Sequence, residues 1–387
     1  MSVKIEASEP FLLFDNPATL HNYHGWSTIT RLHDGKLAVV CSGLRLTHVC
    51  PFGTVLMSES ADEGETWSNP RIVINTVLDD RDAGICAFGE NDVIVTSFNN
   101  TPQIQRQANA ERLAAVKNGG DAGFSRIYGA DTEAACRYID GYLDFVESSA
   151  DHLKYLGSTF TVSRDNGISF GELHTVPVTS PHGPLAMPDG TLYYVGTVFD
   201  MVPGGKSEIA AYRIYPDGRT EKVCTVARGD GVNYYFCEPH AVLLPDGKII
   251  VHIRVQGCSG STKPCFTVFQ CESTDGGLTY SEPRQLLSDL GGAPPHLTLL
   301  PDGNLLSAYG YRQRPYGIRC MISRDNGETW DTDHVLVKYE YGTGLMSDLG
   351  YPSTVALKDG SLLTVYYAHT DTDEPAKLYG VRWRYSF

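Results

Sequence analysis

The chain has 387 residues, of which 42% are hydrophobic and 20% charged, and these values are typical of a folded globular protein rather than a disordered one. Its formal net charge of −15 would repel a nucleic-acid duplex or an anionic membrane surface, so we expect neither as a partner. No apolar run reaches the ~18 residues of a membrane span, and the opening MSVKIEASEPFLLF lacks the basic segment and apolar core of a signal peptide. We therefore expect a cytoplasmic protein with reduced cysteines, a mature secreted form being the alternative.

One phrase recurs along the chain, in which two hydrophobic stretches flank an Asp-Gly pair. Each copy predicts two strands joined by a tight hairpin. The turns stand at Asp34, Asp189, Asp246, Asp302 and Asp359, with Glu90 in the equivalent place of a degenerate copy. Successive turns are 56 or 57 residues apart, except for one step of 99. Six units of this length fit four-stranded blades, so we predict an all-β, six-bladed β-propeller that forms a single domain over residues 1–387.

The long step between Glu90 and Asp189 contains a segment of different composition, residues 101–157. TPQIQRQANAERLAAVK and DTEAACRYIDGYLDFVE have apolar residues at helical spacing and few β-branched residues. We predict a mainly helical insertion on a loop of the second blade, packed beside the mouth of the propeller. At the two ends of the chain, SEPFLLF and LYGVRWRYSF are expected to complete one blade together, because closing the ring removes unpaired strand edges.

A second pattern, S-x-D-x-G-x-[ST]-aromatic, follows the hairpins in four units. Its copies are Ser60–Trp67, Ser163–Phe170, Ser273–Tyr280 and Ser323–Trp330. The Asp and Gly close a turn, and the aromatic residue packs behind it. We interpret these copies as structural turns on the outside of the blades, and their aspartates as non-catalytic.

Residues at equal distances from the Asp-Gly turns should occupy equivalent places in the blades. Eight residues before the turns stand Trp26, Asp82, Pro181, Glu238, Pro294 and Tyr351; six or seven before them stand His182, His240 and His296; and Arg254 stands eight after one. Because the inner strands of a propeller end around one funnel, polar groups in register predict a shared wet cavity. The histidines lack a metal-site motif, so we expect sugar binding or acid catalysis, with neither a metal nor another cofactor.

The six units, the S-x-D-x-G turns and this polar set resemble the sialidase (neuraminidase) superfamily, in which such turns are called Asp-boxes. The segments that carry the resemblance are Glu238-PHAVLLPDGKIIVHI-Arg254 and Tyr351-PSTVALKDGSLLTVYY. The resemblance implies that Tyr351 is the nucleophile and Glu238 its base, and that Arg254 binds the substrate. A further arginine should precede the last Asp-box, where the chain offers Arg312, Arg314 and Arg319. Arg314 fits the family spacing best.

The first unit departs from the family pattern. YHGWSTITRLHDG has no counterpart of the family's first arginine; Gly25 fills its slot, with His24 beside it. The loop that holds the family's acidic Asp reads CSGLRLTHVCPFG and contains no carboxylate, whereas LDDRDAG in the second unit is rich in charge. The candidate acids are therefore Asp82 and Asp80, with His24, His48, His240 or His296 behind them.

The resemblance implies an exo-glycosidase that hydrolyses a terminal, acidic sugar by a retaining mechanism. A carboxylate on the anomeric carbon would repel a carboxylate nucleophile, and a phenol avoids this repulsion once a glutamate takes its proton. The missing arginine favours an acidic sugar other than ordinary sialic acid, or a neutral glycoside. The expected substrate ligands are Arg254, Arg314, Arg312, Arg81, His24, His182, His240, His296 and Trp26. Two alternatives stay open: a non-catalytic glycan-binding propeller, and a polysaccharide lyase that uses a Tyr/His pair.

Overall fold

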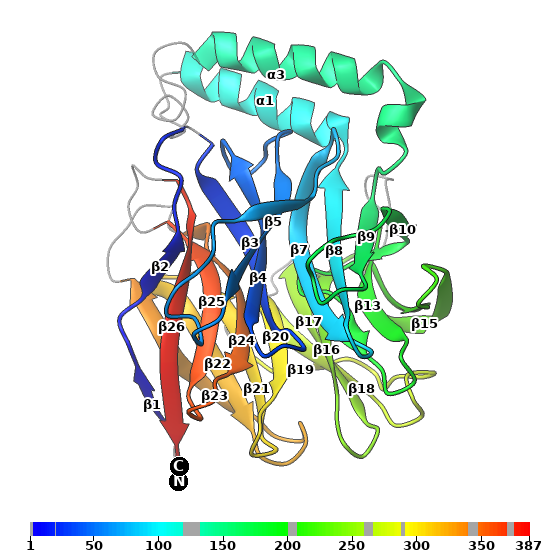
Figure 1. The fold of residues 1–387 in the computed structure, drawn as a ribbon, viewed down its shortest axis with the longest axis vertical. Coiled ribbons are helices and arrows are strands. Elements are labelled where there is room, and N and C mark those ends of the chain that lie inside the picture. The colour runs from blue at the N-terminus through cyan, green and yellow to red at the C-terminus, as the bar shows by residue number, and fades with distance from the viewer. Residues whose placement is uncertain are drawn as a thin grey trace.

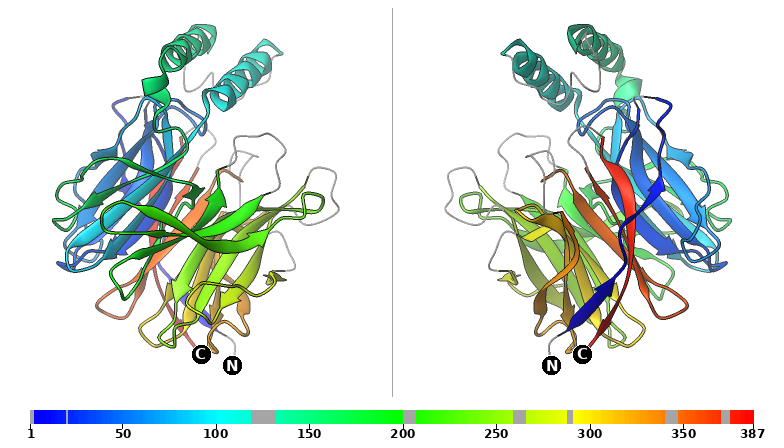
Figure 2. Two further views of the ribbon diagram at one scale, coloured as in Figure 1. Left: turned by 90° about the vertical axis from the view of Figure 1, so that its right-hand side faces the viewer. Right: turned by 90° about the vertical axis from the view of Figure 1, so that its left-hand side faces the viewer.

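The computed structural model describes residues 3–19, 21–118, 132–199, 207–258, 266–287, 291–339, 347–369 and 375–387. Within these ranges, six antiparallel sheets stand around a common axis, one for each repeat unit (Figures 1 and 2). The chain is a six-bladed β-propeller, as the spacing of the Asp-Gly turns predicts.

The strands of the blades follow one another in chain order. Blade 1 has β3 (Tyr23–Arg31), β4 (Leu37–Arg45), β5 (Thr54–Ser60) and β6 (Arg71–Ile74); blade 2 has β7 (Asp79–Phe88), β8 (Asp92–Asn100), β9 (Ser158–Ser163) and β10 (His174–Val176). Blade 3 has β11 (Val178–Thr179), β12 (Leu185–Ala186), β13 (Leu192–Val198), β14 (Glu208–Ile214) and β15 (Thr220–Arg228); blade 4 has β16 (Tyr234–Leu243), β17 (Ile249–Gly257), β18 (Thr267–Ser273) and β19 (Arg284–Gln285). Blade 5 has β20 (Gly291–Leu299), β21 (Leu305–Tyr311), β22 (Tyr316–Ser323) and β23 (Asp331–Tyr339); blade 6 has β24 (Gly350–Ala356), β25 (Leu362–Ala368) and β26 (Lys377–Ser386).

Blade 6 is completed by the beginning of the chain. Both β1 (Lys4–Ala7) and β2 (Phe11–Phe14) pair antiparallel with β26. The two chain ends accordingly lie side by side in Figure 1. The expected closure of one blade by segments from both ends is confirmed.

The core lies between neighbouring blades, and the first strands of the blades contact one another around the axis. Leu37 and Val39 of blade 1, for example, are buried in one cluster with Leu363 and Val365 of blade 6. Side chains on both faces of each inner strand are packed against a neighbour, because each blade is covered by another blade on either side. The polar side chains at the starts of these strands are therefore held by rigid, buried backbone.

The S-x-D-x-G turns connect third and fourth strands in four blades. In the fifth blade, the Asp325 carboxylate accepts hydrogen bonds from Ser323 Oγ (2.8 Å) and from Thr329 N (2.9 Å) and Oγ1 (2.5 Å). The Ser-to-Asp bond recurs in the other three copies. The glycine of the motif has a left-handed backbone, with φ of 84° at Gly327, which a side chain would strain. These aspartates hold turns together on the periphery.

Replacing the aspartate of such a turn should lower stability. We expect Asp325→Ala to reduce the melting temperature by roughly 1–3 °C, because the turn loses its shared acceptor and a protein of this size shifts little per lost bond. Calorimetric melting measures the change, with Glu172→Ala at an exposed site as the control. Unaltered melting together with a large loss of turnover would instead place the turn in the functional site.

The segment between β8 and β9 forms two helices, α1 (Pro102–Lys117) and α3 (Thr132–Glu147), followed by the short η1 (Ala150–Leu153). The Thr101 hydroxyl caps α1 by accepting from Ile104 N (3.2 Å), and Pro102 suits the first helical turn. Both helices lie across one end of the propeller in Figure 1. The predicted helical insertion is confirmed over these residues, while positions 119–131 lie outside the described residues. No helix in the described ranges has the length and apolar character needed to cross a membrane.

The insertion packs on the loop between β4 and β5. The ring of Phe52 in that loop lies 5.8 Å from Tyr138 and 4.9 Å from Tyr142 of α3, measured between centroids. Tyr142 also donates a hydrogen bond to the carbonyl of Val77 (2.9 Å). Because this loop is at the end where the inner strands begin, the insertion stands beside the mouth of the propeller.

Candidate active site

The inner strands carry a repeated backbone irregularity at the start of each unit. Trp26, Asp82, Glu238 and Tyr351, all eight residues before their turns, have left-handed φ values of 56°, 51°, 47° and 51°. Each lies at a break in the strand register, the mark of a β-bulge. Proline occupies the same place in the other two blades, where its ring excludes positive φ. A left-handed non-glycine residue costs roughly 1–2 kcal/mol, and such strain concentrates at functional sites.

Tyr351 and Glu238 meet at the axis, although they come from blades 6 and 4. The Tyr351 hydroxyl donates to Glu238 Oε1 over 2.7 Å, Arg254 Nη1 donates to Glu238 Oε2, and Arg254 Nη1 lies 3.3 Å from the Tyr351 oxygen. Burial, and then the charges of Glu238 and Asp82, raise the pKa of Tyr351 well above its ordinary value. Burial alone would lower the pKa of Arg254, but Glu238 raises it well above normal. The resting site therefore holds a neutral phenol against a carboxylate.

Asp82 is the third charged member of this group. It is 5% exposed, and its Oδ1 accepts no hydrogen bond from the described residues. Burial raises the pKa of Asp82 to about 7; the nearby Arg81 guanidinium opposes this rise and Glu238 adds to it. Asp82 is thus a carboxyl group that can hold a proton near neutral pH and has a free oxygen beside the Tyr351–Glu238 pair.

Asp80 has a similarly raised pKa, but its carboxyl group lies in a different environment. Burial raises the pKa of Asp80 to about 7. Its carboxyl group accepts from Thr76 N (2.7 Å), Thr76 Oγ1 (3.0 Å) and Asn99 Nδ2 (3.2 Å), and the residue is fully buried. Of the two predicted acids, Asp82 interacts electrostatically with Glu238 and Tyr351, whereas the Asp80 carboxyl group is enclosed by Thr76 and Asn99.

Arginines approach the pair from other blades. Arg312 Nε donates to the Leu349 carbonyl (2.9 Å), and its guanidinium lies 5.9 Å from the Tyr351 ring centroid. Arg314 is exposed in the hairpin between β21 and β22, and Arg319 forms an ion pair with the exposed Asp333. The structure therefore places Arg312 against Tyr351, where the family spacing favours Arg314.

Arg81 packs over the ring of Trp26, which itself contacts Tyr351. Its guanidinium is 4.2 Å from the Trp26 ring centroid, and its Nε is 3.9 Å from Asp82 Oδ1. Trp26 is 1% exposed and contacts Tyr351 edge to face at 6.3 Å. Trp26 is therefore buried in contact with both Tyr351 and Arg81, and this packing holds the Arg81 guanidinium next to the site.

The three histidines pack together at the axis. His240 and His296 stack with centroids 4.4 Å apart, and His182 meets His296 at 4.8 Å and Tyr351 at 6.4 Å. Burial lowers the pKa of His240 to about 3 and the pKa values of the other two well below normal. They are neutral packing groups beneath the site. Within the described residues, no group of three or more His, Cys, Asp or Glu side chains is arranged to hold a metal ion.

His24 points to a different place from the Tyr351–Glu238 pair. Its ring packs edge to face on Phe14 at 4.9 Å, and Nδ1 contacts the Asn22 carbonyl at 3.0 Å. Burial lowers the pKa of His24 to about 4. His24 thus contacts Phe14 of β2 and the backbone just before β3.

A polar group that we call the Asp348 cluster comprises Tyr23, His48, Asp348, Tyr367 and His369. Sequence reasoning named His48 among the candidate acids and missed the other four members. The Asp348 carboxylate contacts Tyr23 OH at 2.8 Å, His48 Nδ1 at 2.9 Å, Tyr367 OH at 2.9 Å and His369 Nε2 at 3.2 Å. Arg312 Nη2 reaches Tyr367 OH at 3.4 Å, which joins this cluster to the Tyr351 pair. A signal was available: Tyr23, Asp79 and Asp348 each stand eleven residues before their turns.

A second missed group links the insertion to the site. The buried Asp79 carboxylate accepts from Arg45 Nη1 (2.5 Å) and from Gln105 Nε2 of α1 (2.5 Å), and Arg81 Nη1 lies 3.6 Å away. Although burial opposes ionisation, the two arginines lower the pKa of Asp79. Gln105 therefore helps to hold the carboxylate that positions Arg81.

We expect Gln105→Leu to weaken substrate binding as well as stability. The buried Asp79 carboxylate would lose one hydrogen-bond donor, which lowers the free energy of unfolding by about 1–3 kcal/mol. Asp79 would then no longer hold the Arg81 guanidinium in a fixed position. KM for an active substrate should rise about 3–10-fold, the scale of one hydrogen bond, with Gln107→Leu on the exposed side of α1 as the control. Lower stability with an unaltered KM would separate Asp79 from substrate binding.

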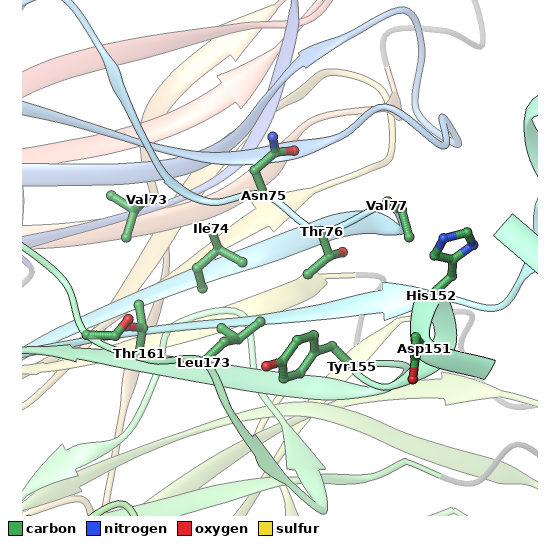
Figure 3. A pocket seen from close by; sticks show the side chains of 11 residues that line it. Val73, Ile74, Asn75, Thr76, Val77, Asp151, His152, Tyr155, Thr161 and Leu173 are labelled. Atoms are coloured by element: carbon green, nitrogen blue, oxygen red, sulfur yellow. The ribbon is translucent and has the colours of Figure 1, made fainter. Parts of the chain in front are cut away.

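A lateral cavity of about 500 Å³ lies between blades 1 and 2, away from these groups (Figure 3). Its lining comes from the end of β6, from η1 and from blade 2, with Thr76, His152 and Tyr155 among its polar members. None of the residues of the Tyr351 pair or the Asp348 cluster lines it. The cavity is a crevice between blades, and the charged groups described above lie at the axis instead.

No protein-family model and no curated protein matches the chain. Solved structures resemble it, among them a protein of unknown function from Dyadobacter fermentans, with 17% identity and a TM-score of 0.72 over 98% of this chain and 99% of that one. The Trypanosoma rangeli sialidase with 2,3-difluorosialic acid, described as a covalent intermediate, matches with 17% identity and a TM-score of 0.59 over 98% of this chain and 59% of that one. The NanB sialidase of Streptococcus pneumoniae matches with 13% identity and a TM-score of 0.62 over 98% and 70%. The chain thus spans 59% of the trypanosome enzyme, and at these identities the likeness shows a shared sialidase-like propeller fold.

Proposed function

We propose that the protein is a retaining exo-glycosidase of the sialidase type that removes a terminal acidic sugar. The observation that carries the proposal is the 2.7 Å hydrogen bond from the Tyr351 hydroxyl to Glu238, flanked by Arg254 and by the protonatable Asp82. A phenol beside a carboxylate base is the nucleophile that suits a substrate with its own carboxylate at the reacting carbon.

In the first half of the reaction, Tyr351 Oη attacks the anomeric carbon while Glu238 takes the phenolic proton. The bond to the leaving oxygen breaks, and Asp82 gives its proton to that oxygen. In the second half, water attacks the same carbon, Asp82 takes the water's proton, and Glu238 returns its proton to Tyr351. Two inversions retain the configuration, and each side chain ends in its starting state.

Three arginines supply the positive charge that an acidic sugar needs. Arg254 and Arg312 lie next to Tyr351, and Arg81 stands next to Asp82. Guanidinium groups bind carboxylates through paired hydrogen bonds. We infer that Arg81, from blade 2, provides the cation that blade 1 lacks at Gly25, so that the site accepts a sugar related to sialic acid in a changed orientation.

Two further points support the assignment to this class. The trypanosome enzyme with a similar fold is described as forming a covalent intermediate with 2,3-difluorosialic acid. The S-x-D-x-G turns of this chain sit between outer strands and have the hydrogen bonds expected of Asp-boxes. We therefore interpret the chain as an Asp-box propeller with a divergent active site.

Covalent trapping tests the proposal. The protein is incubated with 2,3-difluorosialic acid, and with aryl glycosides of sialic acid, of its deaminated analogue, of a uronic acid and of a neutral hexose. We expect one glycoside of an acidic sugar to be hydrolysed. We also expect intact-protein mass spectrometry to show one added glycosyl unit, and peptide mass spectrometry after proteolysis to locate it on the peptide with Tyr351, both absent in Tyr351→Phe. Binding without turnover would support the glycan-binding alternative, and an unsaturated ultraviolet-absorbing product would support the lyase.

A further inference from the structure

His48 lies between two groups of opposite charge that belong to different blades. Its Nδ1 is 2.9 Å from Asp348 Oδ1, and its Nε2 is 3.5 Å from Arg81 Nη2. Asp348 shortly precedes the first strand of blade 6, His48 lies in the loop between β4 and β5 of blade 1, and Arg81 lies on β7 of blade 2. The imidazole ring therefore connects a carboxylate to a guanidinium group across three blades.

The two partners require the same protonation state of the His48 ring. An ionised carboxylate can only accept hydrogen bonds, so Nδ1 must carry a proton, and a guanidinium can only donate, so Nε2 must carry none. Although burial opposes ionisation, His48 and His369 hold the pKa of Asp348 well below its ordinary value. Burial lowers the pKa of His48 and the neighbouring arginines add to this, although Asp348 opposes it. The ring is therefore neutral at neutral pH, and its Nε2 accepts from Arg81.

His48 holds Arg81 through its backbone as well as through its ring. Arg81 Nη1 donates to the His48 carbonyl over 3.2 Å, while Nη2 donates to Nε2. Asp79 Oδ2 is 3.6 Å from Nη1, and the Trp26 ring lies 4.2 Å from the centre of the guanidinium group. The two Nη atoms and the plane of the group are thus fixed by contacts on the side of blade 1.

The Nε atom of the same guanidinium group faces Asp82 without bonding to it. Arg81 Nε and Asp82 Oδ1 are 3.9 Å apart. Both atoms are buried, and neither has a hydrogen-bond partner among the described residues. A hydrogen bond between a guanidinium and a carboxylate is about 2.8 Å long, so a buried donor and a buried acceptor stop about 1 Å short of pairing. Since unpaired buried groups cost free energy, something must hold Arg81 back.

The contacts of His48 supply this restraint. Since Asp82 is the acid in the proposed function, on which this inference rests, we propose that His48 is a positioning residue, whose ring and carbonyl hold the Arg81 guanidinium back from Asp82. An ion pair with a guanidinium lowers the pKa of a carboxylic acid. Asp82 bonded to Arg81 would therefore be ionised at neutral pH and could not protonate a leaving group.

The pH dependence of turnover tests the restraint. For the acidic sugar hydrolysed in the panel above, kcat on its lactoside is measured against pH, and thermal melting verifies that each variant folds. His48→Phe keeps a ring against Trp26 but removes both nitrogens; if it does not fold, His48→Leu takes its place. Because His48 is neutral, its replacement removes no charge. The alkaline decline of kcat should nevertheless move to lower pH by about one unit, since Arg81 can then close on Asp82.

Three matched variants separate this effect from a general disturbance of the site. His48→Gln keeps an acceptor oxygen within reach of Arg81 and should keep the wild-type profile. His369→Phe alters the Asp348 cluster away from Arg81 and should keep it too. In an Arg81→Gln background, His48→Phe should cause no further shift. The other charged or titratable groups that the structure places near Asp82 stay unaltered in all of these variants, and they are Arg45, Tyr194, Cys237, Glu238, Arg254 and Tyr351.

A profile in His48→Phe that is unchanged or moved to higher pH overturns the proposal, as does an equal shift in His369→Phe. If no glycoside is hydrolysed, the proposed function fails, and the restraint is decided without turnover. The Asp82 carboxyl group is then titrated by carbon NMR with labelled aspartate, its signal being assigned from Asp82→Asn. A lower pKa in His48→Phe than in wild type would support the restraint, and an equal or higher pKa would refute it.

Discussion

Tyr351→Phe should lower turnover of an active glycoside by at least about 100-fold, the scale on which enzymes lose a nucleophile or its base. The substitution removes a single oxygen, and the ring keeps its contacts with Trp26 and Tyr367. The variant should therefore fold normally. Steady-state kcat/KM on an aryl glycoside measures the loss, and thermal melting verifies that the fold is retained.

Glu238→Gln is the companion to this change. The amide keeps the size of the side chain and can still accept from the Tyr351 hydroxyl, but it cannot take the proton. We expect a loss of turnover of similar size, at least about 100-fold. Since both side chains act in one step, the double variant should be little worse than either single one. Activity within tenfold of wild type in either variant would contradict a tyrosine nucleophile activated by Glu238.

Asp82→Asn should have an effect that depends on the leaving group. A sugar leaving group needs a proton, so its hydrolysis should fall by about 100-fold or more. An aryl leaving group with a low pKa leaves without one, and its hydrolysis should fall far less. Rates for a disaccharide and for a nitrophenyl glycoside of the same acidic sugar give the comparison. Equal losses on both substrates would remove Asp82 from the role of acid.

The pH profile gives an independent test of Asp82. Its pKa is raised to about 7, and the reaction needs the protonated form, so kcat should decline as pH rises through 7. The raised pKa also affects stability. Between pH ~3.9, the pKa of an unfolded Asp, and pH 7, the folded protein binds this proton and the unfolded chain does not. The stabilisation that Asp82 contributes in its protonated form is therefore lost as pH rises through this window. Asp80→Asn is the matched control, because Asp80 has a similar pKa but is enclosed; the alkaline decline should persist in it and disappear in Asp82→Asn.

The fold followed from the regular spacing of the Asp-Gly turns, because each turn marks a hairpin and equal spacing marks equal blades. The same register led to Trp26, Asp82, Glu238 and Tyr351, which share one backbone conformation in the structure. The equivalent position three residues further upstream holds Tyr23, Asp79 and Asp348. Those residues were missed because the positions compared between units were six to eight residues before the turns and eight after them.

Two choices between neighbouring residues could not be made from sequence. Asp80 and Asp82 are two residues apart, so a regular strand would turn both to the same face; the bulge at Asp82 separates them. Arg312 and Arg314 both lie in the connection between β21 and β22. Which of the two side chains is near Tyr351 depends on where β21 ends. His48 is far from Asp348 in sequence, and only the ring closure between blades 1 and 6 brings them together.

The repeated bulge also has an evolutionary consequence. In four of the six blades it provides a position, or slot, whose left-handed backbone suits glycine, yet these slots hold Trp26, Asp82, Glu238 and Tyr351. The fold therefore tolerates backbone strain around the candidate site. Activity and stability are then opposed at these positions, since relief of the strain removes the functional group. Because the slots are geometrically alike, a reactive group can move from one blade to another while the scaffold stays constant. Under the proposed function, the placement of Arg81 and Asp82 in blade 2 is what such an exchange would leave behind.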